Sequence, residues 1–432
     1  MNCANQERSY FGPLAVLTAP FFFMGMITCL NDILVPHLKG VFSLTYAQAA
    51  LVQCCFFTAY LIVSIPSGRF AEKFGYKNGI VVGLLVAAFG CALFWPAAEY
   101  LSYSFFLMAL FVLASGIVLI QVALNPYVSL LGPPDTASSR LTVTQAFNSV
   151  GTAIAPKIGA FFILGAAASA GGVAIIGSQD HASYVQGPYL VLSSIMVVVA
   201  LVLMAIRMPN VSGLRSSASL GVVHRTMWSH RHLVLGALAI FMYVGAEVSI
   251  GSFLINLISL PEVAGIPEDQ AAEYLALYWG GAMVGRFVGS AVMRFVCPAS
   301  VLAFNALSVI LLVATAIFSG GYVAVWCLVA VGLFNSVMFP TIFTLAVKGL
   351  DSQTSRGSGL LCTSIFGGAI IPVIHGVCAD YIGLLPAFSV PLLCYVYVMY
   401  YGFRGHRTSG HQGRLYEADT LDERNAVGRV SA

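Results

Sequence analysis

Apolar runs of about twenty residues recur along the whole chain, separated by polar or Gly/Pro-containing segments. A transmembrane helix needs roughly 20 apolar residues to cross a hydrocarbon core of about 30 Å, whereas an ordinary soluble domain is about 25% charged. Because only 9% of the 432 residues are charged and 59% are hydrophobic, a soluble fold is excluded. The pattern predicts an all-α membrane protein with twelve transmembrane helices in two six-helix bundles. The predicted spans are 12–36, 46–68, 78–98, 104–130, 141–165, 188–207, 232–257, 271–295, 299–318, 321–346, 357–378 and 386–403.

The positive charges are distributed unevenly between the two sets of predicted loops. Twelve spans place both termini on one side, where the loops carry eleven Lys or Arg residues, while the opposite loops carry only Lys39. The eleven are Arg69, Lys73, Lys77, Arg140, Arg207, Arg215, Arg225, Arg231, Arg294, Lys348 and Arg356. By the positive-inside rule both termini are predicted to be cytoplasmic, in a bacterial inner membrane. The first residues lack the features of a signal peptide, so we expect the first span to be retained.

A polar segment near the middle of the chain divides it into two halves. Residues 208–231 are the longest polar stretch between predicted spans, and we expect them to be a cytoplasmic linker. The linker would join a first bundle at 12–207 to a second bundle at 232–403. The short N-terminus at 1–11 is expected to be cytoplasmic. The tail at 404–432 has too little apolar surface to fold alone and is expected to be disordered.

The sequence has no pattern typical of catalysis or metal binding. Its ten cysteines show no CxxC spacing and fall mostly inside apolar runs, as packing residues do. The motifs HExxH, GxSxG and GxGxxG do not occur, and His37 and His375 have no metal-spaced partners. The net charge of +3 is too small to indicate a nucleic-acid partner. We therefore expect no enzyme activity, no metal, no cofactor and no nucleic-acid partner.

A short motif with charges and glycines follows the second predicted span. It comprises Gly68, Glu72, Lys73, Gly75 and Lys77, and it predicts a tight cytoplasmic turn with a gating role. The glycines allow a sharp reversal, and the acid can cap or pair with a neighbouring helix end. The alternative is an ordinary solvated loop. The spacing G-x-x-x-[D/E]-x-x-G recurs at 376–383, which is typical of folds built from repeated helical triplets but can also arise by chance.

Four ionisable residues are the clear cases inside the predicted spans, where each costs about 2.5 to 3.5 kcal/mol on insertion scales. They are Asp32, Lys157, Glu247 and Arg286. Glu247 lies about fifteen residues from the cytoplasmic end of its span, which places it near the middle of the membrane. Asp32 and Glu247 are therefore candidates for ion coupling. The structural alternative for Glu247 is an ion pair with Arg286.

Side-chain amides cluster in the fourth and fifth predicted spans. Gln121 and Asn125 are four residues apart and Gln145 and Asn148 are three apart, so each pair shares a helix face. Pro126 frees a backbone carbonyl for an outside partner. Amides offer donors and acceptors without net charge, which suits a neutral polyol, although each could instead join two helices. Further candidate ligands are Asn31, Asn256, Asn305 and Asn335.

Longer segments resemble a known family. They are NDILVPHL at 31–38, CALFWPAAEY at 91–100, QVALNPYVSLLG at 121–132, RLTVTQAFNSVGTAIAP at 140–156, YVGAEVSIGSFLIN at 243–256, GGAMVGRFVGSA at 280–291 and FPTIFTLAVKGL at 339–350. Together with the 68–77 motif they resemble the fucose-permease group of the major facilitator superfamily, and most closely its glucose/galactose transporter branch. The resemblance runs from about residue 12 to residue 403.

The resemblance implies a proton-linked importer of a neutral hexose that alternates access between two bundles. The group's aspartate matches Asp32 and its amides match Gln145 and Asn148, but its glutamate is replaced by Gln121, which cannot titrate. Glu247 is expected to take over an acidic role. The glucose/galactose branch resembles this chain in both changes, which favours glucose, galactose or N-acetylglucosamine over fucose. Sodium is the alternative coupling ion. A drug/proton antiporter and a non-transporting sugar sensor are the alternative functions, and a monomer in the lipid bilayer is expected.

Overall fold

The computed structural model describes residues 12–29, 46–169, 186–209 and 227–407, with backbone alone at 46–51, 156–169 and 268–269. The described part is almost wholly helical. Its first half contains an N-terminal helix (Gly12–Cys29), α2 (Tyr46–Phe74), α3 (Tyr76–Glu99), α4 (Tyr103–Leu130), α5 (Ala137–Ser169) and α7 (Gln186–Ala205). The second half contains α8 (Arg231–Ser259), α9 (Glu268–Val292), α10 (Pro298–Ser319), α11 (Gly321–Asn335), α12 (Met338–Val347), α13 (Thr354–Thr363), α14 (Gly367–Ile382), α15 (Leu384–Ala387) and α16 (Ser389–Tyr400).

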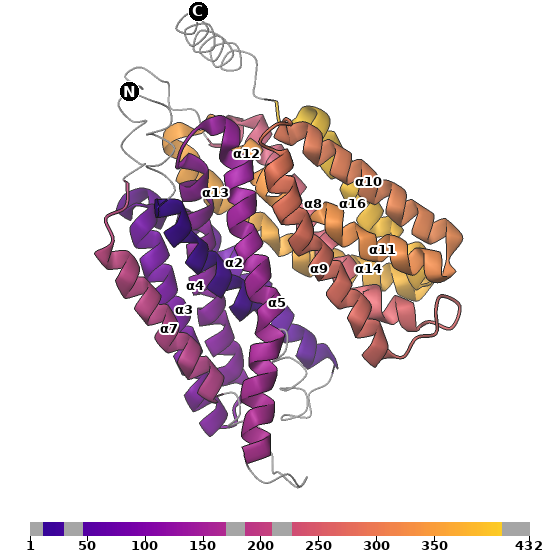
Figure 1. Cartoon of the computed structure of the whole chain (residues 1–432), viewed down its shortest axis with the longest axis horizontal. Helices are drawn as coiled ribbons and strands as arrows, with labels where there is room; N and C mark the ends of the chain where they lie inside the picture. Colours follow the sequence, from indigo (N-terminus) through magenta and orange to yellow (C-terminus); the bar gives the residue numbers. More distant parts are fainter. Residues whose placement is uncertain (1–11, 30–45, 170–185, 210–226, 408–432) are drawn as a thin grey trace, which may run out of the picture.

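Three of the predicted spans are broken helices. The pairs α11–α12, α13–α14 and α15–α16 each form one continuous crossing, so the described residues make twelve crossings. Ten of these contain, within the residues described with their side chains, a stretch long and apolar enough to span a membrane; α9 and α5, whose second half is described as backbone alone, are the other two. These two helices carry Gln145, Asn148 and Arg286, and they lie side by side (Figure 1). Polar side chains on these two helices can therefore bond to a neighbouring helix.

Some predicted boundaries were wrong. α2 continues to Phe74, beyond the predicted end at residue 68, because charged residues that end an apolar run are still good helix formers. The predicted single span at 321–346 is interrupted at Ser336 and Val337. The end of the first predicted span, including Asn31 and Asp32, lies outside the described residues, as do 1–11, most of the linker and the tail beyond residue 407.

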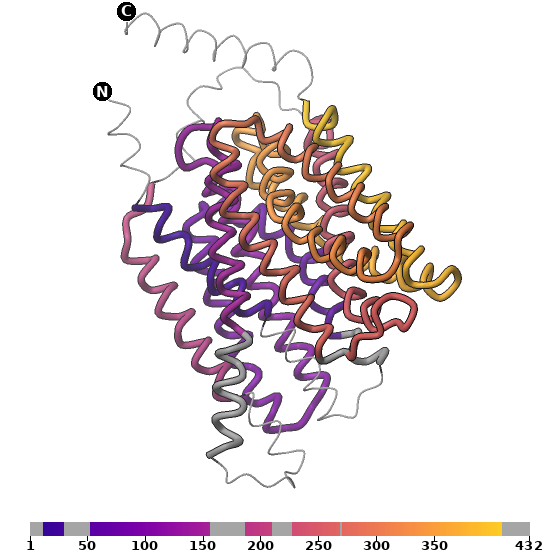
Figure 2. Tube along the Cα trace, turned by 45° about the vertical axis from the view of Figure 1, so that its right-hand side comes forward, coloured from indigo at the N-terminus to yellow at the C-terminus, as the bar shows by residue number. Residues whose placement is uncertain are grey.

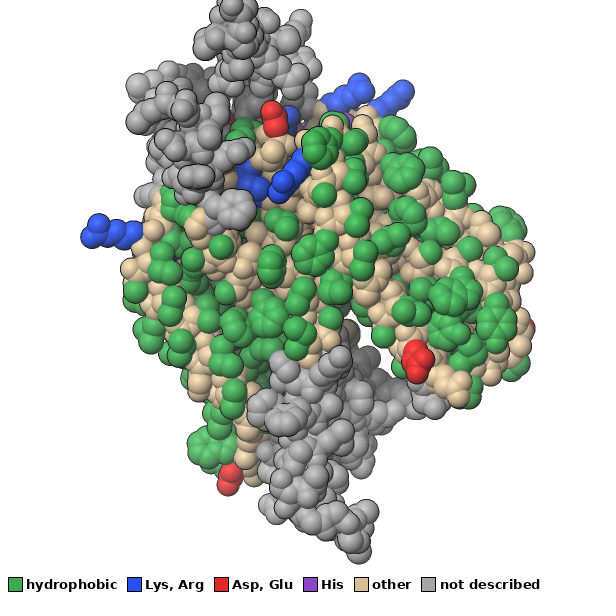
Figure 3. Space-filling view, in the orientation of Figure 1, with side chains coloured by type: hydrophobic (Ala, Val, Ile, Leu, Met, Phe, Trp, Pro, Cys, Tyr) green, Lys and Arg blue, Asp and Glu red, His purple; other side chains and the backbone are tan. Residues whose placement is uncertain are grey.

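The two halves of the chain form two adjacent bundles that meet at one end. Figure 1 shows the first half in indigo to magenta and the second in orange to yellow, converging at the top, and Figure 2 shows the same arrangement from another side. We call the end that carries Glu72 and Arg356 the inner end, and the opposite end the outer end. Lys and Arg side chains gather at the inner end, while hydrophobic side chains cover the middle of the molecule (Figure 3).

Small residues allow close helix packing within the first half. A Cβ added to Gly90 of α3 would lie 2.4 Å from the Leu113 backbone nitrogen of α4, and one on Gly116 of α4 would lie 2.3 Å from the Ala87 nitrogen of α3. Large hydrophobic side chains instead face outward, with Phe295 and Phe318 about nine-tenths exposed, at 90% and 89%. An exposed apolar surface of this extent is expected of a protein surrounded by lipid.

Candidate functional site

The inner end is closed by backbone contact between α2 and α13. A Cβ on Gly68 of α2 would lie 2.8 Å from the Ser355 carbonyl oxygen, and one on Gly359 of α13 would lie 2.8 Å from the Ser64 carbonyl oxygen. Only glycine lets the two helices come this close without displacing a main chain. The contact therefore explains why the motif begins with glycine at position 68.

The charged residues of the motif join two pairs of helices, α2 with α13 and α3 with α7. Glu72 of α2 forms an ion pair with Arg356 of α13, with 2.6 Å between the carboxylate oxygen and Nε. Lys77 of α3 donates to the carbonyl oxygens of Met204 and Ile206, at 3.0 and 2.8 Å, at the end of α7. Both contacts satisfy charges at the inner end.

The motif is mostly helix, and not the tight turn that we predicted. Gly68, Glu72 and Lys73 lie in the last two turns of α2, and the reversal is made by Gly75 alone, whose φ is +86°. Lys73 lies over the Phe74 ring, 5.3 Å from its centroid. A positive φ is accessible to glycine at little cost, so Gly75 can end one helix just before the next begins.

The backbone carbonyl freed by Pro126 has a hydrogen-bond partner on another helix, as the sequence predicted. Pro126 has no N–H to donate to Val122, four residues earlier, and the Val122 oxygen instead accepts a hydrogen bond from the Ser358 hydroxyl of α13 at 2.8 Å. Ser355, one turn earlier on α13, donates to the Tyr76 hydroxyl at 2.9 Å. These buried bonds join the second half to α3 and α4 of the first.

The predicted amides of α4 lie close to this contact. Asn125 is fully buried, and neither atom of its side-chain amide has a hydrogen-bond partner among the described residues. Gln121 is half-buried, and its Oε1 likewise has none in the described chain. An amide buried without partners costs free energy, so both side chains have unused capacity for a polar solute or for another conformation.

Helices α5 and α9 form a second contact between the halves. Ser139 of α5 donates to the Ser290 carbonyl at 2.6 Å, and Ser138 bonds to Thr344 of α12 at 2.6 Å. Arg286 of α9 donates to the Gln145 carbonyl at 3.3 Å and to the Ser149 hydroxyl. Gln145 therefore takes part through its backbone, while its side chain is mostly buried.

Asn148 links α5 to the N-terminal helix. Its Nδ2 donates to the Phe21 carbonyl at 3.1 Å, and a Cβ on Gly25 would lie 2.0 Å from the Asn148 carbonyl oxygen. Asn148 thus has the helix-joining role that was the alternative to sugar binding. An amide has further donor and acceptor positions, so one such bond leaves both roles open.

Glu247 lies in the middle of α8 within a polar network. The Tyr243 hydroxyl is 2.8 Å from Glu247 Oε1 and 2.9 Å from the Asn335 carbonyl oxygen, and Asn335 Nδ2 donates to the Tyr278 hydroxyl at 2.9 Å. Asn335 is fully buried, whereas Glu247 is half-buried. Within the described chain no direct ion pair joins Glu247 to Arg286, in contrast to the structural alternative. Asn256 is exposed near the outer end of α8.

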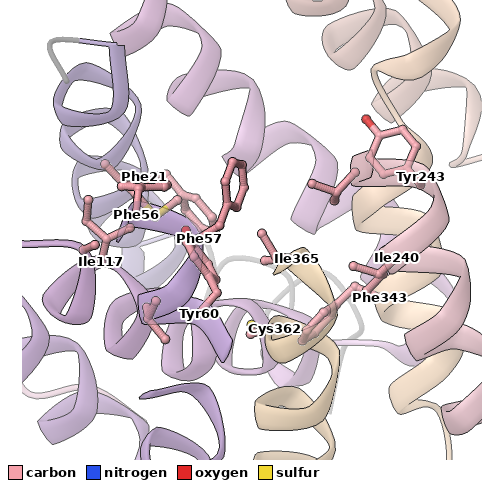
Figure 4. Packing of buried hydrophobic residues seen from close by; sticks show 14 of the residues in the cluster. Phe21, Phe56, Phe57, Tyr60, Ile117, Ile240, Tyr243, Phe343, Cys362 and Ile365 are labelled. Atoms are coloured by element: carbon pink, nitrogen blue, oxygen red, sulfur yellow. The ribbon is translucent and has the colours of Figure 1, made fainter. Parts of the chain in front are cut away.

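Aromatic and apolar side chains fill the middle level between the halves. Figure 4 shows Phe57 and Tyr60 of α2 pointing toward Ile365 and Cys362 of the second half, and all four are buried. One turn outward from Glu247, a Cβ on Gly251 would lie 3.3 Å from the Trp279 indole. Trp279 is 39% exposed, so its ring is available for stacking on a solute.

All hydrogen bonds between the halves in the described chain lie toward the inner end. They come from Ser138, Ser139, Arg286, Ser355, Arg356 and Ser358. Toward the outer end, Figure 3 shows the molecule hollowed between its two halves. The polar network around Glu247 thus lies on the outer side of a closed inner end, and Gln121 and Asn125 lie at the level of the closing bond to Val122.

Sequence reasoning missed several residues of these contacts. Tyr243 and Tyr278 were hidden among abundant aromatics, and Ser138, Ser139 and Ser358 are small polar residues that usually bond to their own helix. One sequence signal could have found such contacts. A proline removes the helical donor of the carbonyl four residues earlier, so that carbonyl needs another partner. Pro126 frees Val122 in this way, and Pro340 frees Ser336, whose carbonyl accepts a bond from Arg286 Nε at 3.3 Å.

Comparison with known proteins decides the family. The model of the Major Facilitator Superfamily matches residues 16–373, well over half of the chain. The chain belongs to the major facilitator superfamily. Membership confirms the fold class and the resemblance predicted from the sequence, and it places the chain among transporters and not among enzymes.

Curated members of the superfamily are similar over nearly the whole chain. A glucose/galactose transporter of Brucella abortus is 52% identical over 404 residues, covering 94% of this chain and 96% of the relative. A putative glucose/galactose transporter of Helicobacter pylori is 47% identical, covering 93% and 98%. The L-fucose-proton symporter of Escherichia coli is 36% identical, covering 91% and 93%.

Solved structures of the superfamily share the fold. A crystal structure of the transporter FucP in the outward conformation matches with a TM-score of 0.83 and 34% identity, covering 93% of this chain and 100% of that one. The proton:xylose symporter XylE matches with a TM-score of 0.75 at 13% identity, covering 94% and 97%, which shows the fold alone.

Proposed function

We propose that the chain is a secondary active transporter that imports a neutral hexose together with protons. The observation that carries this proposal is the 52% identity to a glucose/galactose transporter across 94% of the chain. The similarity to an L-fucose-proton symporter supports protons as the coupling ion. Glucose and galactose are the first candidates, followed by N-acetylglucosamine and fucose.

The structure corresponds to the outward-facing step of the transport cycle. Two observations support this assignment: the bonds between the halves gather at the inner end, and FucP in the outward conformation has the same fold at a TM-score of 0.83. Alternating access then requires breaking the α2–α13 and α5–α9 contacts and forming others at the outer end.

The proposed sugar ligands are Asn31, Gln121, Asn125, Gln145, Asn148, Asn256 and Asn335. The unused hydrogen-bonding capacity of Gln121 and Asn125 supports a role for α4. For proton coupling we propose Glu247 and Asp32. In the described chain, Glu247 is the carboxylate that lies at the middle of a span, and a carboxylate there can load a proton on one side and release it on the other.

The inner end is proposed to face the cytoplasm of a bacterial cell, with both termini on that side. The gathering of Lys and Arg at this end supports the orientation (Figure 3). The bundles would be 12–207 and 232–403, joined by a cytoplasmic linker at 208–231 and followed by a tail at 404–432. We expect a monomer as the working unit.

Uptake by purified protein in lipid vesicles tests the proposal. Radiolabelled glucose should accumulate when an inward proton gradient is imposed, and unlabelled galactose should compete in counterflow. Accumulation that follows a sodium gradient at fixed pH would show that the coupling ion is sodium and not the proton. Efflux of a cationic dye without sugar flux would support the drug/proton antiporter, and sugar binding without flux would indicate a sensor.

Neutral variants test the coupling residues separately. Asp32→Asn and Glu247→Gln should each abolish accumulation yet preserve counterflow, because exchange of bound sugar needs the site but no net proton movement. If both variants still concentrate sugar as the parent does, neither carboxylate couples transport and another group must do so. A parent that equilibrates sugar without concentrating it would be a facilitator.

A further inference from the structure

The spacing of the inner-end motif recurs in the structure at the outer end of the molecule. The first motif, at the inner end of α2, contains Gly68, Glu72 and Gly75, and the second motif, at the outer end of α14, contains Gly376, Asp380 and Gly383. The two closing glycines have nearly the same backbone conformation, with φ +86° and ψ +158° at Gly75 and φ +87° and ψ +156° at Gly383. Each is followed at once by another helix, so the recurrence is structural as well as sequential.

The two crossings that carry the motifs match along their whole length. The helix α2 runs from the outer end to the inner end, whereas α13 and α14 together run from the inner end to the outer end. One offset of 308 residues relates the first residues (46 and 354), the last residues (74 and 382) and the leading glycines (68 and 376) of the two crossings. Such a relation is typical of transporters built from inverted repeats, and it gives each position of α2 a counterpart in α13 or α14.

In this structure the first motif contacts the other half and the second motif does not. Gly68 and Glu72 are engaged with α13, as described above. For a Cβ added to Gly376, the one described atom within 4 Å belongs to the Phe253 ring of the same half, at 3.3 Å. Asp380 is exposed, and within the described chain it has no ion pair or hydrogen bond. The second motif therefore has an open glycine face and a free carboxylate while the inner end is closed.

We propose that the second motif closes the outer end against α2 when the inner end opens. This inference rests on the proposed alternating access, and it names the contact that replaces the one broken between α2 and α13. The glycine lets α14 approach the main chain of α2, and the carboxylate binds a donor on α2. The two motifs are then used in turn, one in each state of the cycle.

The shared register identifies the partners on α2. Arg356, which pairs with the acid of the first motif, has Gln48 as its counterpart in the first turn of α2. In the state closed to the outside, the Asp380 carboxylate therefore accepts a hydrogen bond from the Gln48 side-chain amide. The same register places Gly376 against the main chain at Ala47. Asp380 and Gln48 are positioning residues of transport and require no contact with the sugar.

The outer contact is weaker than the inner one. Gln48 supplies a neutral amide where the inner end has the guanidinium of Arg356. Leu51 stands at the counterpart of Gly359, so one of the two glycines that allow close approach at the inner end is missing at the outer end. The empty carrier therefore favours a closed inner end, which is the arrangement of this structure, and its sugar site faces outward.

The distance between the outer ends of the two halves tests the proposal. Tyr100 at the end of α3 and Phe318 near the end of α10 are exposed, at 75% and 89%, and they lie in different halves. Replacing both with p-acetylphenylalanine allows spin labelling without use of the native cysteines. Double electron–electron resonance on the full chain in lipid nanodiscs, without sugar or gradient, gives the populations with a long and a short distance. The short distance reports the state closed to the outside.

Four variants separate the parts of the proposal. Gln48→Arg should increase the short-distance population roughly two- to fivefold, because the guanidinium can form an exposed ion pair with Asp380. Adding Asp380→Asn should remove this increase. Adding Glu262→Gln instead, which neutralises another exposed acid of the second half at the outer end, should preserve the increase. Gly376→Ala should abolish the short-distance population and leave the inner end closed, since its Cβ meets only the Phe253 ring in this state.

The proposal is overturned if Gln48→Arg leaves both populations unchanged, or if Glu262→Gln cancels its effect as fully as Asp380→Asn does. A short distance that persists unchanged in Gly376→Ala also overturns it. If Gly376→Ala does not fold, the Gln48 variants decide the outcome. The assay contains no sugar, so its failure leaves hexose uptake untouched. A carrier of a different solute would still show these shifts, so a failure of hexose uptake leaves the result standing.

Discussion

The Ser358 hydroxyl of α13 donates to the Val122 carbonyl of α4 at 2.8 Å, across the boundary between the halves. Pro126 has removed the helical donor of this carbonyl, and both groups are buried. In the state where the halves separate at this end, the carbonyl must find water or another donor. The bond is thus available in one state of the cycle and lost in the other.

Replacing Ser358 with Ala should therefore disfavour the closed inner end. Leaving the buried Val122 carbonyl unpaired costs about 1–3 kcal/mol in that state, which shifts the conformational equilibrium by roughly five-fold or more. Asp135 and Arg294 are exposed near the inner end. Double electron–electron resonance between spin labels at these two positions should show a longer mean distance in Ser358→Ala than in the parent. Thr315→Ala is the matched control, because Thr315 is exposed and bonds only to its own helix at Leu311. An unchanged distance in Ser358→Ala would contradict the prediction.

The Glu72–Arg356 ion pair should affect exchange rate more than sugar affinity. The two side chains are 35% and 56% exposed, so the pair contributes only about 0.2–1 kcal/mol and Glu72→Gln should change the rate of counterflow by roughly 1.4- to 5-fold. The effect should fall in high salt. The charge-reversed pair Glu72→Arg with Arg356→Glu should restore the parent rate. Loss of equilibrium binding at an unchanged exchange rate would show that the motif belongs to the sugar site.

Gly68→Ala should prevent closure of the inner end. The added Cβ would lie 2.8 Å from the Ser355 carbonyl oxygen, which is main chain and cannot rotate away. Hydrogen–deuterium exchange at the inner ends of α2 and α13 should rise strongly. Gly187→Ala on α7 is the control, because a Cβ there meets no atom within 4 Å. Equal exchange in the two variants would mean that the helices can separate slightly without cost.

Asn148→Ala separates sugar binding from helix packing. If the amide binds sugar, an unpaired donor or acceptor costs about 1–3 kcal/mol and weakens binding roughly tenfold. If it only joins α5 to the N-terminal helix at Phe21, the melting temperature falls and affinity is kept. Calorimetric titration with glucose and thermal unfolding of the same sample distinguish the two, with Gln145→Ala measured in parallel. Unchanged affinity in both variants would remove α5 from the sugar site.

The apolar runs were enough to predict the twelve crossings, because a membrane imposes a length and a composition on each helix. The prolines gave local information as well, since the carbonyl opposite Pro126 could be expected to need a partner. The sequence could not show that this partner is Ser358, which lies more than 200 residues away along the chain.

Pairings between distant helices were the part that could not be predicted. Opposite charge suggested that Arg286 and Glu247 form an ion pair, yet Arg286 bonds to neutral groups on α5 and Glu247 to Tyr243. The acceptor that a long side chain reaches depends on how the two bundles dock. A single sequence does not reveal that docking. The extension of α2 to Phe74 was missed because helix and apolar run do not end at the same residue when a helix leaves the membrane.

The contact between α5 and α9 has a consequence for how the protein is made. A helix that emerges from the ribosome is offered to lipid one segment at a time, so the polar residues Gln145 and Asn148 of α5 reach the membrane before α9 has been made. α5 is synthesised more than 100 residues before α9, its main partner in the other half. We expect α5 to enter the bilayer only together with the neighbouring N-terminal helix and α4. A chain truncated before α9 should leave the inner end of α5 without its partner and should be degraded by membrane proteases.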